Sequence, residues 1–375
     1  MRKLTLIALL LALALAGCAP AWQLTLTGGD APVVFDAAAW KALAEELPDP
    51  DREDALRLEQ VLWEAGFPAV ERVAVGGTSY DWNDLHDSAW LTRRGALELG
   101  EAKVELGPAS ELAVTPPALL AQAEASITDI APTIAQALGV PAPAQATGRA
   151  LTAERAPHVA LVYLDGFGYL RYQEARAAGW IPNLAALGEP LCALTVYPSA
   201  TRNATAALLT GAPPIINGVR DRDLRTTEAE TILDVLKEAG RSNQVVEGNA
   251  LAFNLRNATF KLSGDVDGDE NTDDEVLANT LAVLEGGMPD LLFAHFHGID
   301  DAGHGDGPDS PVEIARIQEA DRGLGEIIQR LPSGTLLIVF ADHGMRAVQE
   351  DERQGNHGTL LARDMFIPII LYRCP

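Results

Sequence analysis

Long apolar runs that stop abruptly at charged residues dominate the second half of the chain. One run occupies residues 336–341, and two others begin at Val159 and Leu291. Uninterrupted apolar segments of this length predict strands that are buried on both faces of a mostly parallel sheet. Ligands of such sheets bind beyond the carboxyl ends of the strands, so the residues that follow these runs are candidates for a shared site.

The residues that follow the runs are carboxylates and imidazoles. They are Asp165, then Asp300 with His304, then Asp342 with His343, and finally His357, which precedes another apolar run at residues 365–372. Zinc-type cations prefer these side chains. Each residue alone is better explained as a cap, a turn or a surface residue, but the ordered set at successive strand ends favours a metal site.

Thr201 is the candidate nucleophile. It follows a predicted strand at residues 191–197 and precedes a predicted helix at residues 204–209. Its hydroxyl would therefore lie at a helix N-terminus, where free backbone N–H groups and the helix dipole favour an anion. The alternative interpretation is an ordinary threonine N-cap.

Taken in order, these residues resemble the alkaline phosphatase superfamily, nearest to its type I phosphodiesterase/nucleotide pyrophosphatase branch. That family has an Asp after the first strand, a Thr ahead of a Thr-Gly pair, an Asp-x-x-x-His element, an Asp-His-Gly element and a late Gly-x-His-Gly. Here these elements carry Asp165, Thr201, Asp300, Asp342 and His357, and the resemblance spans roughly residues 158–372.

The resemblance implies an α/β fold, an alkaline-phosphatase-like sandwich with a central, mostly parallel sheet flanked by helices. It also implies two divalent metal ions of zinc type. One ion would be held by Asp300, His304 and His357, and the other by Asp165, Asp342, His343 and the nucleophile Thr201. The implied reaction is hydrolysis of phosphate esters through a phosphothreonine intermediate.

Two departures from the family pattern affect the expected substrate. The phosphodiesterases usually have an Asn three residues after the nucleophile, where this chain has Ala204, with Asn203 one position earlier. A second family Asn aligns with Arg222, whose fork could bind a more highly charged phosphate and would favour monoesters. Asn203 and Arg222 are therefore candidate substrate-binding residues, although the arginine segment could equally be a solvated loop. Sulfatases have a Cys or Ser at the Thr201 position, which disfavours that activity.

The N-terminal segment predicts export. Residues 1–18 contain Arg2 and Lys3, an apolar stretch and a Leu-Ala-Gly-Cys ending. This pattern is typical of a signal peptide and resembles the bacterial lipobox, so Cys18 would carry a lipid anchor at the cell envelope. Secretion after cleavage nearby is the alternative. No other stretch is long enough to cross a bilayer.

Charge limits the partners. The formal net charge is −25, which argues against nucleic acid as a partner because polyanions would be repelled. Small phosphate esters can still reach a site whose cations reverse the local sign. Phosphomonoester hydrolysis, transfer of a phosphoryl head group to an envelope acceptor, and a non-catalytic envelope lipoprotein all remain open alternatives.

Residues 22–112 predict a small α+β domain of unknown role, in which residues 51–66 read as a helix and Tyr80, Trp82 and Trp90 belong to an aromatic core. Residues 113–375 form the catalytic domain. Within it, residues 127–151 resemble the segment that usually ends this superfamily's chains, which predicts a circular permutation. A linker helix of similar composition is the alternative.

Three smaller features leave alternatives open. Cys192 and Cys374 could form a disulfide or remain two buried thiols. The Asp-rich segment 264–275 suggests either a calcium loop or a capping box that starts a helix at residues 273–284. Finally, His295 and His297 alternate on the strand before Asp300 and could either line the site or pack in the core.

Overall fold

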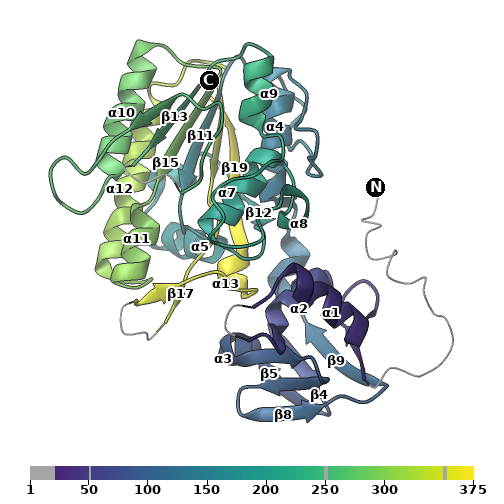
Figure 1. Ribbon diagram of the computed structural model, residues 1–375. Helices are drawn as coiled ribbons and strands as arrows, with labels where there is room; N and C mark the ends of the chain where they lie inside the picture. The colour runs from purple at the N-terminus through teal and green to yellow at the C-terminus, as the bar shows by residue number, and fades with distance from the viewer. Residues whose placement is uncertain (1–21, 50–51, 249–251, 349–352) are drawn as a thin grey trace. The chain divides into compact units, whose positions relative to one another are not determined.

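The computed structural model describes residues 22–49, 52–248, 252–348 and 353–375, which divide into two compact units (Figure 1). The first unit ends at Ala118 and the second is Leu119–Pro375. The boundary expected between residues 112 and 113 was too early, because β9 (Ser110–Thr115) pairs with strands of the first unit. The predicted signal peptide and lipobox Cys18 lie outside the described residues.

The first unit contains two sheets and short helices, as expected for an α+β domain. The sheet orders are β2-β1-β9-β4-β5 and β3-β6-β7-β8. The remaining elements are β1 (Gln23–Thr27), β2 (Val33–Asp36), α1 (Ala37–Glu46), β3 (Ala55–Arg57), α2 (Leu58–Glu64), β4 (Arg72–Val75), β5 (Thr78–Asp81), α3 (Trp82–Leu85), β6 (Ala89–Thr92), β7 (Ala96–Leu99) and β8 (Ala102–Glu105).

The helix expected at residues 51–66 was wrong in its first half. Residues Ala55–Arg57 pair with β6 as strand β3, so the helix begins at Leu58. Of the expected aromatic core, Trp82 is confirmed: it is fully buried and donates its indole N–H to Glu59 at 3.2 Å. Tyr80 and Trp90 are only partly buried.

The second unit is built on an eight-stranded sheet with the order β10-β12-β19-β16-β11-β15-β13-β14. Among its described strands, β19 alone runs antiparallel to both neighbours. The strands are β10 (Ala125–Ser126), β11 (Val159–Leu164), β12 (Leu191–Leu194), β13 (Asn243–Glu247), β14 (Phe260–Leu262), β15 (Leu291–Phe296), β16 (Leu336–Phe340) and β19 (Phe366–Arg373), and β17 (Arg346–Ala347) pairs separately with β18 (Gly355–Asn356). The predicted mostly parallel α/β sheet is confirmed.

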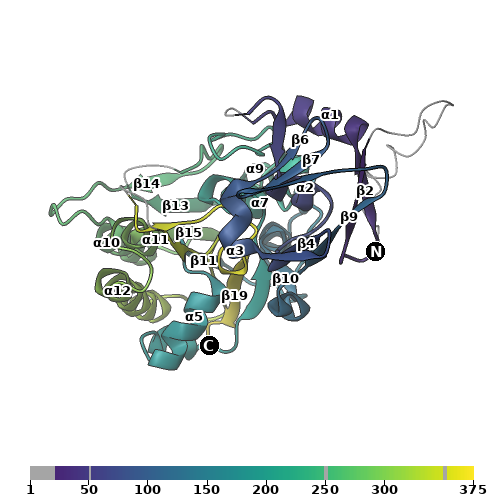
Figure 2. The ribbon, with the colours of Figure 1, turned by 90° about the horizontal axis from the view of Figure 1, so that it is seen from below.

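Helices cover both faces of this sheet (Figure 1). The helices are α4 (Ile130–Leu138), α5 (Tyr169–Ala178), α6 (Pro182–Ala185), α7 (Thr201–Thr210), α8 (Pro214–Asn217), α9 (Ile232–Glu238), α10 (Asp273–Gly286), α11 (Gly298–Gly305), α12 (Pro311–Ile328) and α13 (Ala362–Met365). Seen from below, α5 and α12 lie on one side of β11, and α7 and α9 lie on the other (Figure 2). Every residue of β11, β15 and β16 is buried, which is why these strands read as continuous apolar runs.

The segment at residues 127–151 is an integral part of the second unit. β10 pairs in parallel with β12, and α4 packs against α7 and β11. The carboxylate of Asp129 accepts the backbone N–H of Ser126 at 3.0 Å and that of Arg149 at 2.7 Å, which fastens both ends of the segment. The circular permutation itself stays a prediction from the sequence.

The structure also resolves smaller alternatives. Cys192 and Cys374 are buried free thiols. α10 forms as expected, but the capping box at its start was wrong, because the Thr272 side chain makes no cap hydrogen bond. None of the helices in the described part of the chain combines the length and apolarity needed to span a membrane.

Candidate metal centre

The predicted site residues converge at one end of the sheet, where the parallel strands finish. Asp165 follows β11, and Asp342 and His343 follow β16. Asp300 and His304 lie on α11, which begins two residues after β15. This arrangement follows from the parallel topology, which brings the carboxyl ends of neighbouring strands to one edge.

Asp300, His304 and His357 form the first cluster. The Nε2 atom of His304 lies 3.3 Å from Asp300 Oδ2 and 3.1 Å from His357 Nε2, and His357 Nε2 lies 3.7 Å from Asp300 Oδ1. Asp300 and His304 share one face of α11 because they are four residues apart. His357 follows the short strand β18.

The tautomers in the first cluster are fixed by backbone carbonyls. His304 Nδ1 lies 2.8 Å from the carbonyl oxygen of Gly355, and His357 Nδ1 lies 2.8 Å from that of Ser199. A carbonyl can only accept, so each Nδ1 carries the hydrogen and each neutral Nε2 presents a lone pair. Two lone pairs that face each other at 3.1 Å repel unless a cation lies between them.

Asp165, Asp342 and His343 form the second cluster, next to Thr201. His343 Nε2 lies 3.4 Å from Asp165 Oδ1, 3.2 Å from Asp342 Oδ2 and 3.3 Å from Thr201 Oγ1. Its Nδ1 donates to the carbonyl of Gly344 at 3.0 Å, which again directs the Nε2 lone pair into the cluster. The His343 and His357 rings stack with centroids 3.7 Å apart, so the two clusters are adjacent.

Buried carboxylate oxygens test whether these clusters fit metal ions. Asp165 Oδ1, Asp300 Oδ1 and Asp342 Oδ2 are buried and receive no hydrogen bond from the described residues. Buried oxygens are otherwise almost always satisfied, and a pair of buried clusters of aspartate and histidine supplies the donors that zinc-type cations prefer. The two clusters therefore fit a two-metal site.

The pKa values of the clustered carboxylates and imidazoles differ from their ordinary values because the groups are buried close to one another. Burial, with the charge of Asp165, raises the pKa of Asp342 to about 6 and that of Asp300 well above its ordinary value. Burial would lower the pKa of His343, but the charges of Asp342, Asp300 and Asp165 outweigh it and raise that pKa to about 9. Burial and the neighbouring imidazoles hold the pKa of His357 well below its ordinary range.

The two candidate substrate-binding residues have different surroundings. Arg222 lies beside the first cluster: its Nη2 is 3.7 Å from the point that a Cβ on Gly358 would occupy, next to His357. Its backbone carbonyl accepts a hydrogen bond from Arg202 at 2.9 Å. Asn203 is fully buried and donates to the carbonyl of Val219 at 2.8 Å, which gives it a structural contact and no surface for a substrate.

A third buried cluster was not recognised from the sequence. Glu247 contacts His295 and His297, and both histidines contact Asp165. The sequence left open whether the two histidines line the site or pack in the core, and it did not identify Glu247. Glu247 is the last residue of β13, whose sequence NQVVE contains only two apolar residues, so the signal was weaker than the long apolar runs that precede Asp165 and Asp342.

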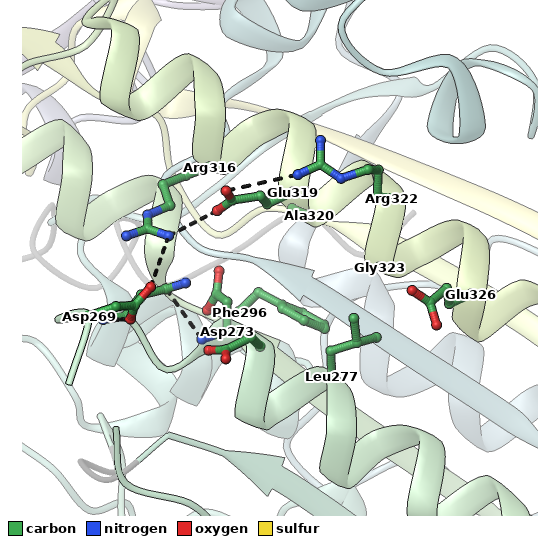
Figure 3. Close-up of a pocket in the computed structure, with 12 residues that line it drawn as sticks. Asp269, Asp273, Leu277, Phe296, Arg316, Glu319, Ala320, Arg322, Gly323 and Glu326 are labelled. Carbon is green, nitrogen blue, oxygen red and sulfur yellow. Dashed lines mark hydrogen bonds and ion pairs between the residues drawn. The ribbon is translucent and has the colours of Figure 1, made fainter. Parts of the chain in front are cut away.

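A separate cavity of about 310 Å³ lies between α10 and α12 (Figure 3). Its arginines are already paired, because the Glu319 carboxylate lies 2.9 Å from Arg316 and 3.9 Å from Arg322. Asp273 also lines this cavity, and its carboxylate accepts the backbone N–H groups of His297 and Gly298. Asp273 thus anchors the backbone that follows β15. None of the residues of the two metal clusters lines this cavity.

Comparison with known sequences places these clusters in a family. Residues 242–369 match the sequence model described as Type I phosphodiesterase / nucleotide pyrophosphatase, and this range contains Asp300, His304, Asp342, His343 and His357. About a third of the chain, with five of the predicted metal ligands, thus resembles the type I phosphodiesterase/nucleotide pyrophosphatase branch of the alkaline phosphatase superfamily. The matched range begins after Asp165 and Thr201, so the superfamily assignment of those two residues rests on their order and on the geometry above.

Several curated proteins resemble parts of this chain. GPI ethanolamine phosphate transferase 3, catalytic subunit, of Mus musculus is 29% identical over 181 residues, or 47% of this chain and 16% of the mouse protein. Phosphopentomutase of Deinococcus radiodurans is 32% identical over 136 residues, or 36% of this chain and 33% of that protein. The chain therefore matches only a minor part of the length of these relatives.

Solved structures resemble the chain at low identity. The alignment with murine ectonucleotide pyrophosphatase / phosphodiesterase 5 covers 57% of this chain and 88% of the murine chain, with 16% identity and a TM-score of 0.47. Phosphonoacetate hydrolase from Sinorhizobium meliloti 1021 covers 52% of this chain and 58% of its own, with 20% identity and a TM-score of 0.42.

Proposed function

We propose that this chain hydrolyses phosphate diesters, in the manner of phosphodiesterases and nucleotide pyrophosphatases, with Thr201 as nucleophile and two divalent cations as cofactors. The observation that carries the proposal is the position of Thr201 Oγ1, 3.3 Å from His343 Nε2 at the edge of the second cluster. Thr201 is also the first residue of α7, so the positive end of that helix points at an incoming phosphate.

The protein's own groups can be given specific tasks. Asp300, His304 and His357 would hold one cation, and the second cluster would hold the other. Bound cations would supply Lewis-acid stabilisation of charge on the phosphoryl oxygens. Thr201 Oγ1 would attack phosphorus as the alcohol leaves with a proton from solvent, and water would then break the Oγ1–P bond to release the product and free Thr201.

A phosphomonoesterase activity competes with this proposal because of Arg222. Its guanidinium lies near His357, where a two-pronged donor could bind the extra charge of a monoester. The discriminating experiment compares hydrolysis of bis-p-nitrophenyl phosphate and p-nitrophenyl phosphate by the full chain with zinc, using Thr201→Ala as control. A Thr201-dependent preference for the diester supports the proposal, and a preference for the monoester replaces it with phosphatase activity.

Head-group transfer is the second candidate function. The similar mouse and human proteins are named as ethanolamine phosphate transferases, and in a transfer reaction an alcohol acceptor would take the place of water. Both reactions share the first displacement at Thr201 and differ only in the second acceptor. Turnover of the diester in rising concentrations of ethylene glycol, with products resolved by ³¹P NMR, separates them. Glycol esters in large excess over free phosphate ester would favour transfer.

If the chain has a non-catalytic role, neither assay will show turnover that depends on Thr201.

We also propose that the chain is exported and anchored by lipid at Cys18, as the lipobox pattern indicates. Metabolic labelling with a radioactive fatty acid in a bacterial host tests the anchor. Label that disappears in Cys18→Ser would support it, and release of unlabelled protein to the medium would favour plain secretion.

A further inference from the structure

Tyr163 is a fully buried residue of β11 whose hydroxyl faces α7, the helix that begins with Thr201. Its oxygen lies 3.4 Å from the hydroxyl oxygen of Thr205, which is on α7 one helical turn after Thr201. Residues four apart in a helix lie on one face, so Tyr163 contacts the turn of α7 that follows the candidate nucleophile. This contact joins the central sheet to the helix that carries the reacting oxygen.

The same hydroxyl also contacts the second metal cluster. Tyr163 pairs in register with Phe340 of β16, and Asp342 follows Phe340 by two residues. Burial raises the pKa of Asp342 to about 6, and a hydrogen bond from the Tyr163 hydroxyl opposes part of that shift. A carboxylate only accepts, so the phenol hydrogen goes to Asp342 and the Thr205 hydroxyl donates to the phenol oxygen. The Tyr163 hydroxyl therefore connects a predicted metal ligand with the nucleophile helix.

Packing fixes the position of this hydroxyl. The Tyr163 ring stacks on the His295 imidazole with centroids 3.6 Å apart, and on the Phe340 ring with centroids 5.0 Å apart. These rings come from the two strands that pair with β11, so Tyr163 is held from both sides. Burial, with the charges of Asp342 and Asp165, raises the pKa of Tyr163 well above its ordinary value, so the phenol keeps its hydrogen. A phenylalanine would retain the ring contacts and lose only the hydroxyl.

The partners of this hydroxyl distinguish it from an ordinary core tyrosine. A buried tyrosine hydroxyl usually finds some hydrogen-bond partner, and a purely structural role would need no particular one. Here one partner, Asp342, is a predicted ligand of the second cluster. The other, Thr205, lies one turn from Thr201, whose Oγ1 is 3.3 Å from His343 Nε2. A shift of α7 relative to Asp342 would change that separation, and a misplacement of about 1 Å can cost roughly 10²-fold in rate.

We propose that Tyr163 is a positioning residue for the reaction, because its hydroxyl ties α7 to Asp342 and so sets the place of Thr201 Oγ1 beside the second cluster. Tyr163 itself touches no reacting atom. The inference rests on the proposed chemistry of Thr201, which defines what has to be positioned. The hydroxyl has two separate tasks: it fixes the position of the nucleophile through Thr205, and it fixes the orientation of one metal ligand through Asp342.

The test removes the two hydroxyls without removing the side chains that carry them. Tyr163→Phe and Thr205→Val are assayed as full chains with zinc on bis-p-nitrophenyl phosphate. Each should lower kcat by about tenfold and leave KM within about twofold, because the substrate still binds while the attacking oxygen is misplaced. The double variant should be no slower than Tyr163→Phe alone, because both changes break the same link. Thr205→Ser restores a hydroxyl and should recover most of the kcat that Thr205→Val loses.

Tyr172→Phe is the matched control. Tyr172 is also a fully buried tyrosine, but it packs against Phe167 and lies on α5, on the other side of β11 from α7 (Figure 2). None of the described residues of either cluster hydrogen-bonds its hydroxyl, so kcat and KM should stay at their wild-type values. A loss in Tyr172→Phe as large as that in Tyr163→Phe would overturn the proposal. Unchanged kcat in Tyr163→Phe, a loss confined to KM, or additive losses in the double variant would overturn it as well.

Two further measurements need no turnover. Dialysis to equilibrium against Co²⁺ should show one ion bound about tenfold more weakly by Tyr163→Phe, through Asp342, and no change in Thr205→Val. Hydrogen exchange, followed by mass spectrometry on a peptide that covers residues 201–210, should be several-fold faster in both variants than in Tyr172→Phe.

These measurements separate failure of the inference from failure of the proposed reaction. If the wild type shows no turnover that depends on Thr201, the proposed reaction fails by itself, and exchange still decides whether Tyr163 ties α7 to the sheet. Faster exchange in both variants supports that link, and unchanged exchange overturns it. If circular dichroism shows that Tyr163→Phe is unfolded, the pair Thr205→Val and Thr205→Ser replaces it, and equal kcat in those two variants would overturn the proposal.

Discussion

The hydroxyl oxygen of Thr201 lies 3.3 Å from Nε2 of His343, within the range that separates the ligand atoms of the second cluster from one another. The hydroxyl is not used to cap α7, because the N-cap is Ala200 and Thr201 is the first helical residue. The interpretation of Thr201 as an ordinary N-cap is therefore wrong. Its oxygen is therefore free to bind a cation that the second cluster would hold.

Thr201→Ala should abolish diester turnover, lowering kcat by on the order of 10³-fold or more, because it removes the attacking oxygen. Thr201→Ser keeps a hydroxyl at the same position and should retain measurable turnover. Bound metal, measured on the same preparations, should be unchanged in the serine variant. Full activity in Thr201→Ala would rule out a threonine nucleophile.

Metal binding should release a proton near neutral pH. In the metal-free chain the pKa of His343 is raised to about 9, so its imidazole carries a proton that a bound cation must displace. Affinity at the second cluster should therefore rise with pH, by up to about tenfold per unit between roughly pH 7 and 9. Calorimetry in buffers of different ionisation enthalpy measures the released proton, and His343→Gln should lose that release. A pH-independent affinity would contradict the assignment.

Arg222→Ala should discriminate between ester classes. If the guanidinium clamps a terminal phosphate, KM for p-nitrophenyl phosphate should rise by about tenfold while KM for the diester changes little. Arg330→Ala, two residues beyond the end of α12, is a charge-matched control, because Arg330 pairs with Glu326 near the end of that helix. Equal effects of both variants on the two substrates would show that Arg222 contributes only long-range charge.

Glu313→Ala should strongly destabilise the second unit. Glu313 and Arg171 form a buried, two-pronged ion pair between α12 and α5, with one bond of 2.9 Å. Removing Glu313 leaves the Nε and Nη2 groups of the buried Arg171 without their carboxylate, although Nη1 keeps Asp309 at 2.6 Å and Glu174 at 3.1 Å. We therefore expect a loss of unfolding free energy at or below the lower end of the roughly 3–5 kcal/mol that a fully broken buried pair costs. Urea denaturation measures the change. Glu189→Ala, which breaks the exposed pair with Arg176, should leave the midpoint nearly unchanged, and similar shifts in both variants would contradict the role of burial.

The sequence indicated these metal-cluster residues because each of them can be recognised from the apolar strand that directly precedes it. Asp165 and Asp342 each close a buried strand, and parallel strands bring such ends together whatever lies between them. Glu247 was missed although it ends β13, because its partners His295 and His297 come from a strand some fifty residues later in the chain. A tertiary contact of this kind leaves no periodic trace in the sequence.

The errors have similar causes. Residues 55–57 have helical neighbours, yet pairing with β6 overrides that local preference. Thr272 and Glu275 have the spacing of a capping box, but the Glu275 carboxylate instead accepts the backbone N–H of Val266 in the Asp-rich loop. Local propensity is decisive only where no tertiary partner competes for the same backbone or side-chain group.

The position of β19 determines when the second unit can become complete. β19 comes after every other strand of its sheet along the chain, but it lies between β12 and β16 in the sheet. Until residues 366–373 have left the ribosome, β10 and β12 have no hydrogen-bonded connection to the strands that present Asp165 and Asp342. The edge of β16 that β19 will cover is meanwhile unpaired. A nascent or truncated chain therefore exposes unpaired backbone N–H and C=O groups that can pair with a strand of another chain and cause aggregation.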